Sequence, residues 1–285
     1  MTSRNREVNG QNILYHYIQK NILSETDEFS KELLKRLLVD LSIWIPPSFY
    51  RKLPIILPYV VRDNSCRTKK PTGEDEWGSA NSEGFLRDDN SLLKGIVRSF
   101  TIRSPRISEY DGKKLGTGFV ASHIWGKVTV ANTVMISSRH HMLNSFVPNL
   151  VWLPVQISKL TDREGSFAQR LLQAISCEIY RHIGLPKELR CIWESLVIPE
   201  GLPKIDVDLK RINYFDMPDG WLIKRIDGLI SEINTVLAIN KTEPVEEGKV
   251  KSSRYLPTLK QIPTQQTKEM NEWLSKYRDL LKSRT

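Results

Sequence analysis

Residues 166–184, SFAQRLLQAISCEIYRHIG, carry the clearest helical pattern in the chain and follow a long β-rich stretch. Apolar side chains recur at helical spacing in this segment: Phe167, Leu171, Leu172, Ile175 and Ile179. Ser166 is a suitable N-cap, and Gly184 is a suitable stop. A helix with one apolar face must pack against another layer, here the strands before it. The order of strands followed by a helix predicts an α+β fold.

The β-rich stretch covers residues 96–160 and contains several runs of β-branched residues. The strand candidates are GIVRSFTIRS, GTGFVASHI, KVTVANTVMISS and NLVWLPVQI. Together with the following helix they define a predicted core at residues 96–184. We expect a helical N-terminal region at residues 1–62, a polar loop region at 63–95 and a C-terminal region at 185–285.

Both outer regions contain amphipathic helices. In the N-terminal region, one helix has an apolar stripe of Phe29, Leu33, Leu34, Leu37, Leu38 and Leu41. Such a stripe is more often core than a subunit interface, and both interpretations stay open. The C-terminal region has a helix pattern at residues 220–240, an exposed linker at 241–265 and a polar terminal helix.

The charge balance favours a polyanionic partner. The 285 residues include 42 Lys and Arg against 33 Asp and Glu, for a net charge of +9, and the pI is about 9.4. Basic side chains that meet phosphates release condensed counterions, which favours nucleic-acid binding. Three cysteines without a CxxC pair indicate neither a disulfide framework nor a zinc knuckle. No apolar run is long enough for a bilayer, and we expect a cytoplasmic location without a membrane partner.

Two polar residues stand at strand ends in positions suited to catalysis. His123 ends the run FVASH, and Asn149 is the first residue of NLVWLP, directly in front of an apolar run. A neutral imidazole near pH 7 is suited to take a proton from water. The alternative is that His123 is a structural strand-end histidine.

ASHIW followed by NLVWLPVQISKLTD resembles the HNH (ββα-metal) nucleases over about 40 residues. In that family the first histidine is the general base, and the asparagine orients it by fixing the loop. The resemblance therefore implies that His123 is the base and Asn149 the organiser. It also implies one divalent ion, here Mg²⁺, held by the residue before the base and by a histidine on the helix.

The metal ligands of this chain depart from the family pattern. Ser122 and Ser158 stand where ligands are expected, and a serine hydroxyl is a poor lone ligand for Mg²⁺. Gln156 and Asp162 are the replacements we expect. Further donors that stay open are Glu164, His140 and His141.

The DNA-binding residues are expected outside this motif. Arg87 and Asn90 lie in EWGSANSEGFLRDDN, where arginine and aromatic side chains on a loop suit contacts with DNA. Lys113 and Lys114, in GKKLGTG, suit phosphate contacts. The alternative for the first group is turn and helix-cap bonding. The stretch EWGSANSEGFLRDDNSLLKG, followed by ASHIW, also resembles, more weakly, the heterodimeric restriction endonucleases that cut asymmetric sites.

A rival site lies at Asp208-Leu-Lys210, which resembles the (D/E)-x-K element of the other large restriction-nuclease fold. In that fold carboxylates bind Mg²⁺ and the lysine polarises the attacking water. Glu178 and Glu194 are the available upstream acids. The alternative is an exposed strand edge or turn.

The interpretation that the sequence favours is a type II site-specific deoxyribonuclease, or one subunit of it. It would cut double-stranded DNA with Mg²⁺ as a homodimer or with a companion subunit. The alternative is a non-catalytic nucleic-acid-binding protein with a degenerate nuclease site, which the two serines at ligand positions favour.

Overall fold

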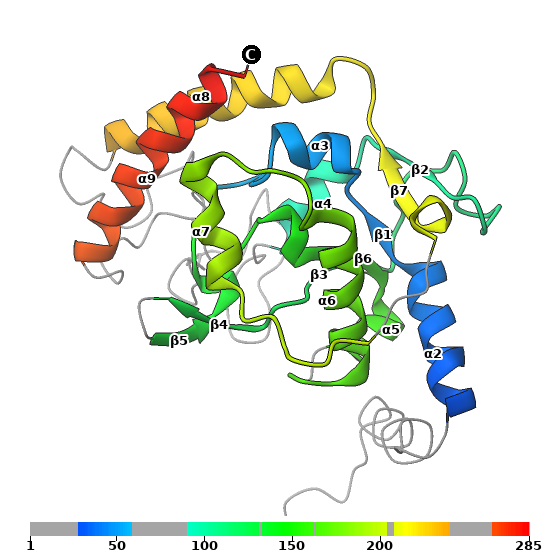
Figure 1. The fold of residues 1–285 in the computed structure, drawn as a ribbon. Coiled ribbons are helices and arrows are strands. Elements are labelled where there is room, and N and C mark those ends of the chain that lie inside the picture. The colour runs from blue at the N-terminus through cyan, green and yellow to red at the C-terminus, as the bar shows by residue number, and fades with distance from the viewer. Residues whose placement is uncertain are drawn as a thin grey trace, which may run out of the picture.

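The structure is a computed structural model that describes residues 28–58, 90–130, 133–161, 164–203, 208–239 and 264–284. Within these ranges, helices surround a mixed sheet (Figure 1), so the predicted α+β class is confirmed. Most of the predicted linker and most of the polar loop region lie outside the described residues, and residues 264–265, expected in the linker, are helical.

Five strands form the central sheet in the order β2-β7-β1-β6-β3. Their bounds are β1 (Ile43–Trp44), β2 (Thr101–Arg103), β3 (Phe119–His123), β6 (Leu150–Pro154) and β7 (Asn213–Asp216). β1 and β7 pair in parallel, and the other pairs are antiparallel. β1 comes from the predicted N-terminal region and β7 from the C-terminal region, so the sheet is shared by three of the sequence regions.

The helices cover both faces and one end of the sheet (Figure 1). Their bounds are α2 (Glu28–Leu41), α3 (Pro47–Lys52), α4 (Asn90–Val97), α5 (Val155–Ser158), α6 (Phe167–Tyr180), α7 (Lys187–Ser195), α8 (Trp221–Ile239) and α9 (Thr264–Lys282). α6 lies across the front of the sheet, α4 packs against β3, and α8 lies beside α9. The expected cap of α6 is confirmed, because the Ser166 hydroxyl accepts a hydrogen bond from the Gln169 amide.

The core is densest around β6, whose first four residues are all buried. Trp152, at its centre, is opposite Ile43 of β1 and Ala121 of β3. The Trp152 ring meets Phe215 of β7 edge-on, with centroids 5.2 Å apart. A continuous apolar run in a strand with neighbours on both sides is typical of a sheet covered on both faces.

Two local expectations need correction. The run GIVRSFTIRS was expected to be one strand, but residues 95–97 complete α4 and only Thr101–Arg103 is β2. Residues 95–97 are helical and not extended, because Leu93 and Val97 are four residues apart and both are buried in the core. The predicted leucine stripe is divided: Leu34 and Leu38 are buried, whereas the rest of the stripe is not. The exposed members are Phe29, Leu33 and Leu37.

The run KVTVANTVMISS forms a hairpin outside the main sheet, with β4 (Lys127–Val130) paired to β5 (Thr133–Ile136). The hairpin belongs to the long connection between β3 and β6, residues 124–149, which also contains the short 3-10 turns Ser137–Arg139 and Val147–Asn149. We call this connection the β3–β6 loop. It joins the two residues that the sequence assigned to catalysis.

Candidate active site at the end of strand β3

His123 is the last residue of β3, at an edge of the sheet and opposite Leu150 of β6. Its side chain is half-buried, and Nε2 lies 2.7 Å from the carbonyl oxygen of Asn144. A carbonyl only accepts hydrogen bonds, so this contact assigns the proton to Nε2. In the neutral ring the basic lone pair is then on Nδ1, and its direction is fixed by the same contact.

Asn149 is fully buried and ties three points of the β3–β6 loop together. Its Oδ1 accepts from the Trp125 amide at 2.8 Å. Its Nδ2 donates to the Leu143 carbonyl at 3.0 Å and to the Ser137 hydroxyl at 3.1 Å. The Asn149 side chain thus joins Trp125, near the start of the loop, to Leu143, the residue before Asn144. This is an organising role for the loop, and it is consistent with the expectation for Asn149.

Helix α6 anchors both ends of the same loop. The Gln173 amide donates from Nε2 to the Ile124 carbonyl at 2.9 Å. The Ser176 hydroxyl donates to the Pro148 carbonyl at 2.6 Å. Both side chains are buried, and a buried carbonyl without such a donor would be costly. The pair of anchors explains how a loop of this length keeps a defined shape beside His123.

The far side of the loop carries two buried histidines that stack on each other. The rings of His140 and His141 have centroids 4.6 Å apart and planes inclined by 19°. Burial lowers the pKa of His140 to about 4, against a smaller raising effect from Glu269. Burial, and then the neighbouring His140, lower the pKa of His141 to about 3. Both rings are therefore neutral near pH 7.

The predicted metal ligands are not brought to His123. Gln156 is exposed in α5, which follows Pro154, and Pro154 pairs with Phe119 at the opposite end of β3. Asp162 lies outside the described residues. The Ser158 hydroxyl donates to the carbonyl of Val155 in its own helix. Within the described ranges, no three side chains of His, Cys, Asp or Glu are grouped as metal ligands, so these residues alone do not fit an Mg²⁺ site.

The predicted DNA-binding residues are placed at different parts of the fold. Asn90 begins α4, the helix that packs on β3, whereas Arg87 lies outside the described residues. Lys113 and Lys114 are exposed, and Lys114 pairs with Thr101 of β2. β2 and β3 are the two outer strands of the sheet. The lysines therefore lie beyond β2 at one edge of the sheet, whereas His123 ends β3 at the other edge.

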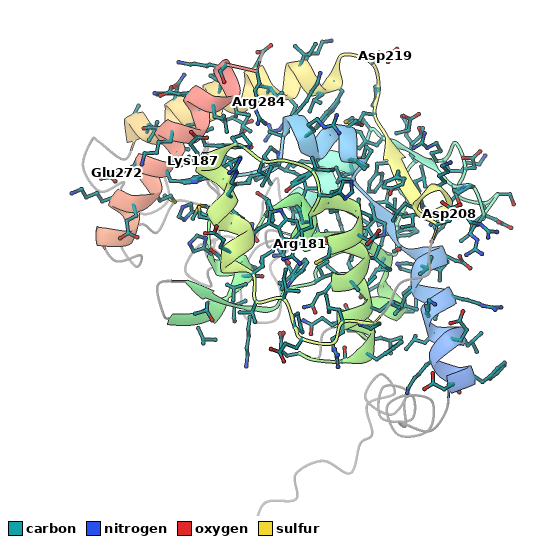
Figure 2. All side chains as sticks on the ribbon, in the orientation of Figure 1. Arg181, Lys187, Asp208, Asp219, Glu272 and Arg284 are labelled. Carbon is teal, nitrogen blue, oxygen red and sulfur yellow. The ribbon has the colours of Figure 1, made fainter. Side chains whose placement is uncertain are left out.

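The rival site at residues 208–211 is exposed. The Asp208 carboxylate accepts from the backbone amide of Lys210 at 3.0 Å, which caps the 3-10 turn Leu209–Arg211. Figure 2 shows Asp208 at the right-hand edge of the molecule, beside the start of β7. Lys210, Glu178 and Glu194 are exposed as well. Asp208 therefore has a local capping role, and the described residues do not gather the other members of a (D/E)-x-K site around it.

Sequence reasoning missed the groups that hold the β3–β6 loop, namely the Asn144 carbonyl and the side chains of Gln173 and Ser176. A signal existed for the last two, because they are polar residues in the middle of an otherwise apolar helix pattern. The carbonyl gave none, since every residue has one.

Comparisons with known protein families, with curated proteins and with solved structures found no match to this chain. Along the described part of the chain, none of the helices has the length and apolar character needed to cross a bilayer.

Proposed function

We propose that this chain is a DNA endonuclease that hydrolyses phosphodiester bonds with a divalent metal ion. We further propose that it acts in the cytoplasm as a type II restriction enzyme or as one subunit of such an enzyme. The observation that carries the proposal is the contact between His123 Nε2 and the Asn144 carbonyl. It fixes the tautomer of a strand-end imidazole, as the role of general base requires, and so supports that role for His123.

The chemistry assigned to this chain is proton transfer from water. Nδ1 of His123 takes the proton as the water oxygen attacks phosphorus. The P–O bond to the leaving oxygen breaks, and that oxygen takes up a proton from solvent. The Asn144 carbonyl stabilises the imidazolium that forms, because the protonated ring donates more strongly from Nε2. Asn149 acts on the loop rather than on substrate, by holding Leu143 next to Asn144.

DNA is the substrate class that the charge supports. The net charge of +9 favours phosphate contacts, and the exposed Lys113 and Lys114 are the residues proposed for them. Log affinity falls as log salt concentration rises, and each phosphate contact makes this slope steeper by about 0.9. Cutting both strands requires a second active site, which a second copy or a companion chain would supply.

The test is digestion of plasmid DNA with and without added Mg²⁺, by the chain alone and together with the product of a neighbouring gene. We expect cleavage that needs both Mg²⁺ and His123. If a companion chain is required, disabling His123 in this chain alone should turn double-strand cleavage into nicking. Cleavage that persists in the presence of excess chelator would contradict the metal-dependent proposal.

A second candidate is a non-catalytic nucleic-acid-binding protein with a degenerate nuclease site. Ser122 and Ser158, at the positions of family ligands, favour it, and so does the intramolecular bond of the Ser158 hydroxyl. Salt-dependent binding to duplex DNA without cleavage under any of these conditions would favour this function. A failure to bind DNA at low ionic strength would exclude both.

A further inference from the structure

Helix α9 reaches back to the N-terminal half of the chain through one buried tyrosine. The Tyr277 hydroxyl donates to the Ile55 carbonyl at 2.9 Å and accepts from the Ile55 amide at 3.2 Å. Burial raises the pKa of Tyr277, so the hydroxyl keeps its proton. Trp273, one turn earlier, stacks on Tyr277 and meets the His141 ring edge-on at 5.2 Å. α9 therefore holds both residues 54–57 and the histidine pair.

Residues 54–57 in turn run alongside the end of the β3–β6 loop. The Ile56 amide donates to the Ser145 carbonyl at 3.1 Å, and the Leu57 amide donates to the Ser145 hydroxyl at 2.8 Å. The Val147 amide donates to the Pro54 carbonyl at 2.9 Å. These bonds act like a short extra antiparallel pairing, with Ile55 at its centre opposite Phe146.

Asn144 lies between two restrained neighbours. On one side, the Leu143 carbonyl accepts from Asn149, and on the other, Ser145 is bonded to Ile56 and Leu57. The Asn144 amide itself donates to the His140 carbonyl at 2.9 Å. The direction of the Asn144 carbonyl is thus set by Asn149 on one side and by the α9-bound segment on the other.

We propose that α9 is a positioning element of the candidate active site and that Tyr277 is its positioning residue. Tyr277 holds Ile55, the segment around Ile55 holds Ser145, and the adjoining Asn144 carbonyl holds the Nε2 proton of His123. Tyr277 acts through backbone and touches no reacting group. The proposal rests on the proposed function for its effect on rate, but its effect on the His123 tautomer is independent of cleavage.

The test is Tyr277→Phe, which removes the hydroxyl and keeps the ring that packs on Trp273. Tyr180→Phe is the matched control, because Tyr180 is also fully buried and its hydroxyl donates to one backbone carbonyl, that of Ile45, outside this chain of contacts. For each variant we would measure kcat, KM for DNA and the ¹⁵N signals of the histidine rings. The chain has five histidines, and His123→Gln identifies the signal of His123.

We expect Tyr277→Phe to lower kcat about 10-fold with little change in KM, as a small misplacement of a catalytic group does. The ¹⁵N signals of His123 should move from the pure Nε2–H tautomer toward a mixture. Tyr180→Phe should change neither, even at an equal loss in melting temperature. The proposal would be overturned if Tyr277→Phe and Tyr180→Phe had the same kcat and the same ¹⁵N signals of His123.

Two further results keep the tests separate. If Tyr277→Phe does not fold, Ser145→Ala removes the acceptor of the Leu57 amide in the same chain of contacts and is judged by the same two measurements. If the wild-type chain does not cleave DNA, or if His123→Ala cleaves normally, the proposed nuclease function fails. The ¹⁵N signals of Tyr277→Phe would then still decide whether α9 positions His123.

Discussion

The β3–β6 loop and the segment of residues 208–211 both carry groups suited to phosphodiester hydrolysis, but their surroundings differ. The β3–β6 loop beside His123 has bonding partners in α6, in Asn149 and in residues 54–57, and most of these partners are buried. Asp208 is bonded to the backbone of Lys210, two residues away, and both side chains are exposed. We expect a short motif to act as a site when groups distant in sequence restrain it, and among the described residues such groups are found around the first segment.

The largest effect should come from His123→Ala. If His123 is the general base, DNA cleavage falls roughly 10² to 10⁴-fold, while DNA binding and the melting temperature stay close to wild type. Lys210→Ala is the matched variant and should cleave normally. The opposite pattern, with His123→Ala active and Lys210→Ala dead, would move the site to residues 208–211. Unfolding of His123→Ala would make His123 a structural residue.

Asn149→Ala should have the next largest effect, measured as free energy of unfolding in urea. The substitution leaves the Trp125 amide and the Leu143 carbonyl without their side-chain partner in a fully buried place. We expect a loss of about 3 to 5 kcal/mol, because several buried polar groups become unsatisfied at once. A loss below about 1 kcal/mol would show that the loop keeps its shape without Asn149.

Acid should weaken the part of the β3–β6 loop that carries His141. The folded-state pKa of His141 is about 3, below the unfolded value of about 6.5, so the unfolded chain takes up a proton first as pH falls. Stability is unaffected above about pH 7 and declines from pH 6.5 toward pH 3, by roughly 2 kcal/mol for this residue at pH 5.

His141→Phe tests this decline, because phenylalanine keeps an aromatic ring beside Trp273 and cannot be protonated. The variant should lose less stability than wild type between pH 7.5 and pH 5 in urea titrations. An equal loss in both proteins would assign the acid sensitivity to other groups.

The smallest effect should come from Asp208→Ala. Its carboxylate caps an exposed 3-10 turn, and loss of an exposed cap costs about 0.5 to 1 kcal/mol. Cleavage should be unchanged. A cleavage defect larger than 10-fold with normal folding would mean that Asp208 has a role beyond capping.

Much of the fold could be predicted from sequence, because helix patterns are long and carry their own signals. The helix with Ser166 as its cap was predicted within a few residues, and so were α8 and α9. The strand predicted from Gly95 onward was wrong at its start, where α4 ends. Ile96 and Val97 fit both a strand and a helix, because the run is so short. The place of β1 between β7 and β6 could not be predicted, since pairing between distant strands leaves no local pattern.

For the candidate site, the sequence indicated His123 and Asn149 but not what holds them. The partner of His123 is a backbone carbonyl, which no residue type reveals. Gln156 was assigned from its distance along the chain, yet the antiparallel register of β3 and β6 puts it at the far end of β3 from His123. Spacing in sequence becomes spacing in space only after the register is known.

The bond between Ile55 and Tyr277 also has a consequence for the timing of synthesis. The two residues are 222 positions apart, and translation at about 5 to 20 residues per second puts roughly 10 to 45 s between them. For most of that interval a nascent chain on the ribosome already contains His123, but the Tyr277 hydroxyl that bonds both backbone groups of Ile55 has not yet been made. For the nuclease proposed above, such a delay would postpone any cleavage of the cell's own DNA until α9 has left the ribosome.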